Sequence, residues 1–195
     1  MGYSIDPISA NCYEGTTCLI NKFGVQNEEQ LANLEATITH AKTTLLESHP
    51  AKLPLDFDYY KSIHRFLFED LYDWAGELRT VDLSKKGTAF CPADQLESLC
   101  NACFDRLKRM NYLKGLAKGQ FIEELVDLYC TTNLLHPFRE GNGRVQRIFI
   151  SKLIEYNGYQ FNFSNIDPDD LMTATIQAAN GVTDQLHALF QNELK

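Results

Sequence analysis

The sequence predicts an all-α helical bundle that carries one short β-hairpin. Two observations lead to this fold class: apolar residues recur every three, four or seven positions through most of the chain, and one segment alternates apolar and polar residues instead. With 195 residues, 44% hydrophobic and 23% charged, the chain has the size and composition of one globular domain. We therefore expect a single domain over residues 1–195, with an irregular segment at 1–24.

Capping residues and apolar spacing place the helices. Asn27 can cap the first helix, with Gln30 three residues on to complete a capping box. A second helix is expected to start after Asp56 and to end near Trp74–Gly76. Further helices are predicted over 94–107, over 120–135, from the loop at 137–143 to Asn157, from Asp167-Pro168 onward, and around Leu186 and Phe190.

The alternating segment lies at 78–90 and reads LRTVDLSKKGTAF. Val81 and Leu83 alternate with polar residues, and the Lys-Lys-Gly that follows supplies a turn, so a short β-hairpin is expected. Because an isolated hairpin is only marginally stable in water, this one should pack on the helices.

Charge and composition exclude several classes of function. The net charge of −8 and the pI near 5.1 give no general attraction to nucleic acid. No apolar run approaches the ~20 residues that span a bilayer, and the first residues do not resemble a secretory signal, so a cytoplasmic protein is expected. The six cysteines should then be reduced thiols, and the lone C-x-x-C of Cys100 and Cys103 lacks the second pair typical of zinc sites.

The strongest chemical signal is the segment His136 to Arg147, HPFREGNGRVQR, between two apolar helices. Pro137 disfavours helical backbone at His136, so the preceding helix should end there. Gly141 and Gly143 let the backbone turn tightly and approach a ligand closely. The chain then enters a helix N-terminus, whose free amides and dipole favour an anion. The segment therefore predicts a phosphate site.

Charged and titratable side chains surround the predicted phosphate site. Arg144 and Arg147 lie three apart in the first helical turn, where cations oppose the helix dipole, so a polyanion in front of them would explain both. Solvated surface arginines are the alternative. Glu140 could pair with an arginine or hold a divalent cation that bridges phosphates. His136 could be a structural histidine or a general base for an attacking hydroxyl.

The segment resembles the signature of the Fic family, H-P-F-x-[DE]-G-N-G-R-x-x-R, at every fixed position. DWAGELR at 73–79 and LSKKGTAF at 83–90 resemble the family's flap region, and YEGTTCLINKFGV at 13–25 is similar to the start of small stand-alone Fic toxins. The resemblance covers essentially the whole chain. It implies a Fic-type helical bundle whose flap is the hairpin at 78–90.

The resemblance also implies roles for individual residues. His136 would deprotonate the target hydroxyl, and Glu140 would hold Mg²⁺ or Mn²⁺. Contacts to ATP would come from Gly141, Asn142, Gly143, Arg144 and Arg147, with Lys85, Lys86, Gly87 and Thr88 of the flap as further candidates. The flap would dock the target protein by strand addition.

The implied activity is transfer of AMP from ATP to a hydroxyl side chain of another protein, with the type II topoisomerases DNA gyrase and topoisomerase IV as candidate targets. The alternatives are transfer of UMP, phosphate or phosphocholine by the same scaffold, and a non-catalytic interaction protein. The related death-on-curing toxins, whose reaction is kinase-like, carry a lysine where this chain has Gly143. That difference favours AMP transfer.

Many Fic proteins carry an inhibitory helix with the pattern [ST]-x-x-x-E-[GN]. This pattern is absent here, since Glu14-Gly15 has Ala10 at the Ser/Thr position and Glu140-Gly141 belongs to the signature. The resemblance therefore implies a toxin regulated by a separate small antitoxin, which would supply the inhibitory glutamate in trans.

Overall fold

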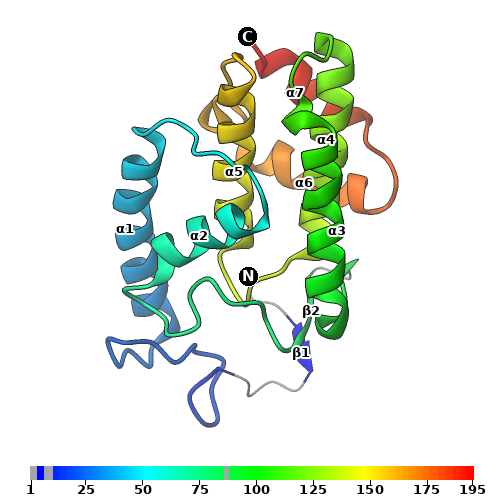
Figure 1. Ribbon diagram of the computed structural model, residues 1–195. Helices are drawn as coiled ribbons and strands as arrows, with labels where there is room; N and C mark the ends of the chain where they lie inside the picture. The colour runs from blue at the N-terminus through cyan, green and yellow to red at the C-terminus, as the bar shows by residue number, and fades with distance from the viewer. Residues whose placement is uncertain (1–3, 7–10, 86–87) are drawn as a thin grey trace.

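The computed structural model describes residues 4–6, 11–85 and 88–195, and within them it shows seven α-helices and one small sheet (Figure 1). The predicted all-α bundle is thus confirmed. The helices are α1 Glu28–Glu47, α2 Phe57–Phe68, α3 Leu96–Arg109, α4 Lys118–Leu135, α5 Asn142–Tyr156, α6 Pro168–Ala179 and α7 Asp184–Glu193.

Helices α4 and α5 organise the bundle. Helix α4 contacts α3, α5, α6 and α7, whereas α5 also contacts α1 and α2. Large side chains fill the space between the helices and are almost completely buried, among them Tyr60, Phe121, Phe138 and Phe149. The short connection from α4 to α5 therefore starts and ends in a close-packed core, which restricts its movement.

Several helices start or end where local sequence signals place them. The side chains of Asn27, Asp56 and Asp167 accept hydrogen bonds from backbone N–H groups in the first turns of α1, α2 and α6. Pro168 is the first residue of α6, a position where a helix does not need the missing N–H. Gly158 follows α5 with φ 85°, the left-handed backbone expected after a helix.

The second helix ends earlier than predicted. Helix α2 stops at Phe68 rather than near Trp74–Gly76, so that prediction is wrong. The N–H groups of Leu71 and Tyr72 both turn back to the Phe68 carbonyl at 2.9 Å, and the N–H of Lys22 donates to the Leu71 carbonyl at 2.8 Å. Contacts with the N-terminal segment therefore replace the end of the predicted helix.

The hairpin is present, and it forms part of a three-stranded antiparallel sheet in the order β1-β2-β3. The strands are β1 Ser4–Asp6, β2 Asp82–Lys85 and β3 Thr88–Ala89, so the paired residues are fewer than the predicted 78–90. Lys86 and Gly87, expected at the turn, lie outside the described residues.

The N-terminal segment is more ordered than the sequence indicates. The expectation of irregular backbone over 1–24 is wrong in two places, because β1 pairs with β2 and an isolated bridge joins Cys12 to Leu19. The pairing of β1 with β2 joins segments that are far apart in the chain, so it leaves no local signal in so short a strand.

The state of the cysteines and the length and polarity of the helices are as the composition predicts. All six cysteines lie in the described residues and are free thiols. Burial raises the pKa of Cys100 to about 12 and that of Cys103 to about 11, so these two thiols stay protonated. Within the part of the chain that the structure describes, every helix is too short or too polar to span a membrane.

Candidate active site

The loop between α4 and α5 turns at two left-handed residues. Helix α4 ends before Pro137, as predicted, but His136 has left-handed backbone, with φ 44° and ψ 58°, rather than the extended backbone that a following proline favours. Gly141 precedes α5 with φ 79°. The side chain of Asn142 accepts from the Phe138 N–H at 2.8 Å and donates to the Phe138 carbonyl at 2.7 Å. The Asn142 side chain therefore closes the loop from inside, and its backbone N–H is the group left to meet a phosphate.

Gly141 is required by close packing. An added Cβ would approach the ring of Phe68 to 2.3 Å, and Phe68 is completely buried. The left-handed backbone at Gly141 directs the chain into α5. The first N–H groups of that helix, at Asn142 and Gly143, have no acceptor within a helix. The predicted helix N-terminus is thus present, and its role as an anion cradle stays a prediction.

His136 is held in one orientation. Its ring stacks on Phe90, which follows the hairpin, with centroids 3.8 Å apart, and its Nδ1 lies 3.2 Å from the Asn133 carbonyl. Because a carbonyl only accepts, Nδ1 carries the proton and Nε2 the lone pair. Burial, followed by the charges of Arg79 and Lys85, lowers the pKa of His136 to about 3. The ring is therefore neutral near pH 7, the form that can accept a proton.

Arg79 joins the base of the hairpin to the end of α4, a role that sequence analysis missed. Its buried guanidinium donates to the carbonyls of His136 at 2.8 Å, Val81 at 2.7 Å and Leu135 at 3.3 Å, and to that of Cys91. The last carbonyls of a helix lack intrahelical donors, and a cation is favourable beside them. Arg79 thus fixes the hairpin relative to His136, and only its place in DWAGELR marked it in the sequence.

His64 of α2 is a second residue that sequence analysis missed, and it holds the backbone of Glu140. Its Nδ1 accepts from the Gly76 N–H at 2.8 Å, so Nε2 carries the proton and donates to the Glu140 carbonyl at 3.1 Å. The ring stacks on Phe68 and on Phe138, with centroids 4.7 and 3.9 Å away. Burial lowers the pKa of His64 to about 3. A histidine on an apolar helix face gives no sequence signal for this contact.

His136 and Arg147 line one cavity of about 500 Å³. Gly143 of α5 and Lys85 of the hairpin also line it, so the structure brings predicted residues from distant segments together. One wall is apolar and is formed by α6 and the residues before it, including Ile166, Leu171, Met172, Ile176 and Ala179. An apolar wall with a few converging polar groups is typical of a small-molecule site.

Arg147 gives this cavity a cation. Burial lowers the pKa of its guanidinium, and among the described residues no carboxylate forms an ion pair with it. A partly buried cation without a counter-ion is unfavourable, which suits an anionic ligand. A second cavity of about 660 Å³ shares Arg147, Phe163 and Ser164 with the first. Arg144 lines only this second cavity, so the first cavity holds one of the two predicted arginines.

Glu140 fits the predicted divalent cation. Its Oε1 accepts from the Gly141 N–H at 2.8 Å, and its side chain is 29% exposed. Among the described residues no group of three or more His, Cys, Asp or Glu side chains could hold a metal alone. Mg²⁺ commonly uses one or two carboxylates and completes its octahedron with phosphate oxygens and water. Glu140 would therefore hold the ion together with a bound nucleotide.

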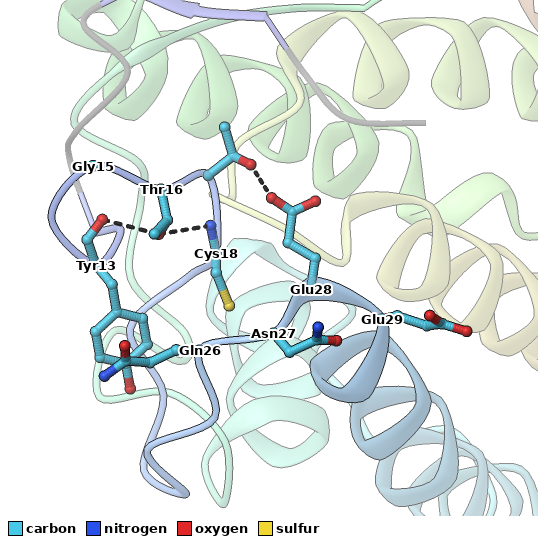
Figure 2. A pocket seen from close by; sticks show the side chains of 9 residues that line it. Tyr13, Gly15, Thr16, Cys18, Gln26, Asn27, Glu28 and Glu29 are labelled. Carbon is cyan, nitrogen blue, oxygen red and sulfur yellow. Dashed lines mark hydrogen bonds between the residues drawn. The ribbon is translucent and has the colours of Figure 1, made fainter.

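A third cavity, of about 840 Å³, lies beside the start of α1 (Figure 2). It is lined by Tyr13, Thr16, Cys18 and Glu28 among others. The hydroxyl of Thr17, which also lines it, donates to the Glu28 carboxylate. Its lining includes carboxylates and no Lys or Arg, so it does not suit a phosphate. We assign the candidate active site to the cavity of His136 and Arg147.

Comparison with known proteins addresses the same part of the chain. The Fic/DOC family matches residues 54–154, which include the whole loop between α4 and α5. The chain belongs to the Fic/DOC family.

Relatives of this Fic-family chain extend over almost its full length. It is 35% identical over 182 residues to a Salmonella typhimurium protein named probable protein adenylyltransferase Fic, covering 93% of this chain and 90% of that one. It is 31% identical over 179 residues to the protein adenylyltransferase VbhT of Bartonella schoenbuchensis, covering 92% of this chain and 37% of VbhT.

Solved Fic structures share the fold. BepC of Bartonella tribocorum, with bound AMPPNP, matches with a TM-score of 0.88 at 28% identity, over 95% of this chain and 96% of that one. The N-terminal Fic domain of a Bartonella quintana effector, with bound ADP, matches with a TM-score of 0.89 at 27% identity, over 95% of this chain and 94% of that one. The Fic-type bundle expected from the signature is therefore confirmed, whereas the roles of the individual residues remain predictions.

Proposed function

We propose that this Fic-family chain is a protein adenylyltransferase, which transfers AMP from ATP to a hydroxyl side chain of a target protein. One observation carries the proposal: neutral His136, partly buried Arg147 and the N-terminus of α5 meet at one cavity. They provide the base, the cation and the amide cradle that a hydroxyl needs when it attacks a phosphate. The names of the relatives, and the AMPPNP and ADP in related structures, support the same chemistry.

The cavity, together with Glu140 and Asn142 of the adjoining loop, offers a contact to each part of ATP. The adenine would rest on the apolar wall of Ile166, Leu171 and Ile176. The phosphates would follow the first N–H groups of α5, and Arg147 would hold a distal phosphate. Glu140 would hold Mg²⁺ or Mn²⁺, which neutralises phosphate charge when bound. The α-phosphorus then faces His136.

The reaction balances with one base. Nε2 of His136 takes the proton from the target hydroxyl, whose oxygen forms a bond to the α-phosphorus as the bond to pyrophosphate breaks. The base needs no prior deprotonation, because the low pKa keeps the ring neutral. Pyrophosphate leaves from the end of the cavity near Arg147.

The target protein would dock as an added strand on the flap. Strand β1 already pairs with β2, so β3 is the edge of the sheet on the far side. The chain continues from β3 directly into Phe90, whose ring stacks on His136. A strand added to β3 would therefore pass close to the base, with main-chain hydrogen bonds supplying affinity.

Two alternatives to AMP transfer can be distinguished from it. The same scaffold could transfer UMP, phosphate or phosphocholine, and the nucleotide consumed with the mass gained by the target distinguishes these from AMP transfer. A non-catalytic interaction protein would have no use for a neutral buried base beside an arginine that lacks a carboxylate partner among the described residues, so this alternative is the weaker one.

We also propose that the chain is the toxin of a toxin–antitoxin pair that acts in the cytoplasm, where ATP and its candidate targets, DNA gyrase and topoisomerase IV, are found. A small antitoxin would offer a glutamate to Arg147. The second cavity supports this, because Arg147 lines it and His136 does not. ATP could still bind, but its distal phosphate would lose its partner, and a shift of ~1 Å can cost about 100-fold in rate.

The function is tested by incubating the chain with labelled ATP, Mg²⁺, a bacterial lysate and, separately, purified DNA gyrase. Labelled protein that gains the mass of AMP supports the proposal, and label from another nucleotide or none from ATP contradicts it. Calorimetry of ATP binding with the cognate antitoxin tests the regulation. An antitoxin that excludes ATP, or one that inhibits equally well without its glutamate, would show the mechanism at Arg147 to be wrong.

A further inference from the structure

Arg144 forms an ion pair with a residue of α1. Its Nη2 donates to Glu35 Oε1 at 2.6 Å and lies 3.4 Å from Glu140 Oε1, while its Nη1 donates to Thr39 Oγ1 at 3.1 Å. The guanidinium also lies over the Phe68 ring, 4.8 Å from its centroid. One arginine therefore stands between two carboxylates, and the closer of them comes from a helix outside the Fic signature.

Burial and hydrogen bonds hold the Glu35 side chain in this position. Its side chain is only 12% exposed, and its second oxygen accepts from the Tyr72 hydroxyl at 2.6 Å. Burial first, and then the Glu35 carboxylate, raises the pKa of Tyr72, so this hydroxyl remains a donor. A carboxylate removed from water to this degree persists only with good partners. Tyr72 and Arg144 are those partners.

The two distances show how the charge of Arg144 is shared. An ordinary charge-assisted N–H···O bond spans about 2.7–2.9 Å, so the contact to Glu35 is a full hydrogen bond and the 3.4 Å contact to Glu140 is a weak one. Glu140 stands four residues before Arg144, a spacing at which the two side chains can pair directly. Without Glu35, the guanidinium would turn its full charge to Glu140.

We infer that Glu35 is a positioning residue for the metal site: by taking the charge of Arg144, it keeps the carboxylate of Glu140 available to a divalent cation. The inference rests on the proposed function, in which Glu140 holds Mg²⁺ or Mn²⁺ with the nucleotide. It assigns α1 a part in the site that lies outside the Fic signature.

The test measures Mn²⁺ affinity by electron paramagnetic resonance in the presence of a saturating non-hydrolysable ATP analogue. Loss of a residue that orients a metal ligand typically weakens metal affinity by about 10–100-fold, and we expect this for Glu35→Gln. Nucleotide affinity without metal should change little. Glu29→Gln removes an exposed charge from the same helix and leaves the contacts of Glu35 intact, so this control should bind Mn²⁺ like the unaltered chain.

A double variant makes the test specific. If Arg144 competes with the metal for Glu140 when Glu35 is lost, Glu35→Gln with Arg144→Gln should recover Mn²⁺ affinity relative to Glu35→Gln alone. A merely structural role for Glu35 predicts no recovery. If Glu35→Gln does not fold, the double variant is compared with the unaltered chain. A double variant that binds Mn²⁺ at least tenfold more weakly than the unaltered chain overturns the inference.

The remaining outcomes separate the inference from the function on which it rests. Unchanged Mn²⁺ affinity in Glu35→Gln overturns the role of Glu35 and leaves the proposed function standing. Tighter nucleotide binding with unchanged Mn²⁺ affinity also overturns it, because Glu35 would then withhold Arg144 from phosphate. If the unaltered chain binds neither the analogue nor Mn²⁺ with it, the proposed function itself fails.

Discussion

Replacing His64 with phenylalanine tests whether the loop of the active site is held from α2. The variant keeps a ring of similar volume between Phe68 and Phe138 but removes both hydrogen bonds. The Gly76 N–H and the Glu140 carbonyl then lose their partners in the interior. Each unsatisfied buried group costs about 1–3 kcal/mol, so the free energy of unfolding should fall by about 2–6 kcal/mol near pH 7.5.

The same variant should be less sensitive to acid. His64 has a folded-state pKa of about 3, whereas an unfolded histidine has a pKa of about 6.5. As pH falls below 6.5 the unfolded chain binds the proton first, so the stability that depends on the neutral ring is lost progressively toward pH 3. At pH 5 this loss is about 2 kcal/mol, from 1.5 pH units at about 1.4 kcal/mol each. The stability gap between His64→Phe and the unaltered chain should therefore narrow by about 2 kcal/mol.

Urea unfolding at pH 7.5 and pH 5, followed by circular dichroism, measures both effects. His40→Phe, on the exposed side of α1, is the matched control and should change neither value. An equal stability gap at the two pH values would refute the argument, because the His64 ring would then not be neutral in the folded protein. A gap below about 1 kcal/mol at pH 7.5 would show that the two hydrogen bonds do not hold the loop.

Three further changes test the loop itself. His136→Ala should lower transfer by about 10²–10⁴-fold while calorimetry shows ATP binding nearly intact, and loss of ATP binding in a folded variant would indicate a structural histidine. Glu140→Gln should lower the rate and weaken activation in a Mg²⁺ titration, whereas full activity of the unaltered chain in excess chelator would remove Glu140 from the metal role. Gly141→Ala should cost about 1–3 kcal/mol more in thermal unfolding than Gly115→Ala. Both glycines have left-handed backbone, but only at Gly141 would a Cβ meet a buried ring, and equal losses would contradict that clash.

Signals within a few residues were enough to predict most helix boundaries. The caps at Asn27, Asp56 and Asp167 act through backbone N–H groups of their own first turns, and Gly158 lies two residues after the last residue of its helix. The end of α2 was mispredicted because the residues after it contact the distant N-terminal segment, where the Lys22 N–H donates to the Leu71 carbonyl. Strand β1 was missed for the same reason, since its partner lies in the hairpin. Contacts between distant segments decide both features.

The loop from His136 to Arg147 was predictable because its functional groups lie within twelve consecutive residues, so their spacing along the chain already brings them close together. The groups that support it were not. His64 and Arg79 reach backbone carbonyls of this loop from other segments, and a donor to a backbone carbonyl leaves no mark on the residue that accepts. The low pKa of His136 arises from burial, which the sequence does not give.

The helix dipole does not distinguish the two arginines at the start of α5, but their partners in the structure do. Cations in the first turn of α5 require an opposing anion, and the sequence suggested one polyanion for both. In the structure Arg144 already has its anion, Glu35, a residue 109 positions earlier in the chain, whereas Arg147 has no carboxylate partner among the described residues. Arg147 is therefore the arginine with charge left for a phosphate or for an inhibitory glutamate. In our proposals, phosphate binding and its regulation belong to Arg147, and Glu35 protects the metal ligand Glu140 by pairing with Arg144.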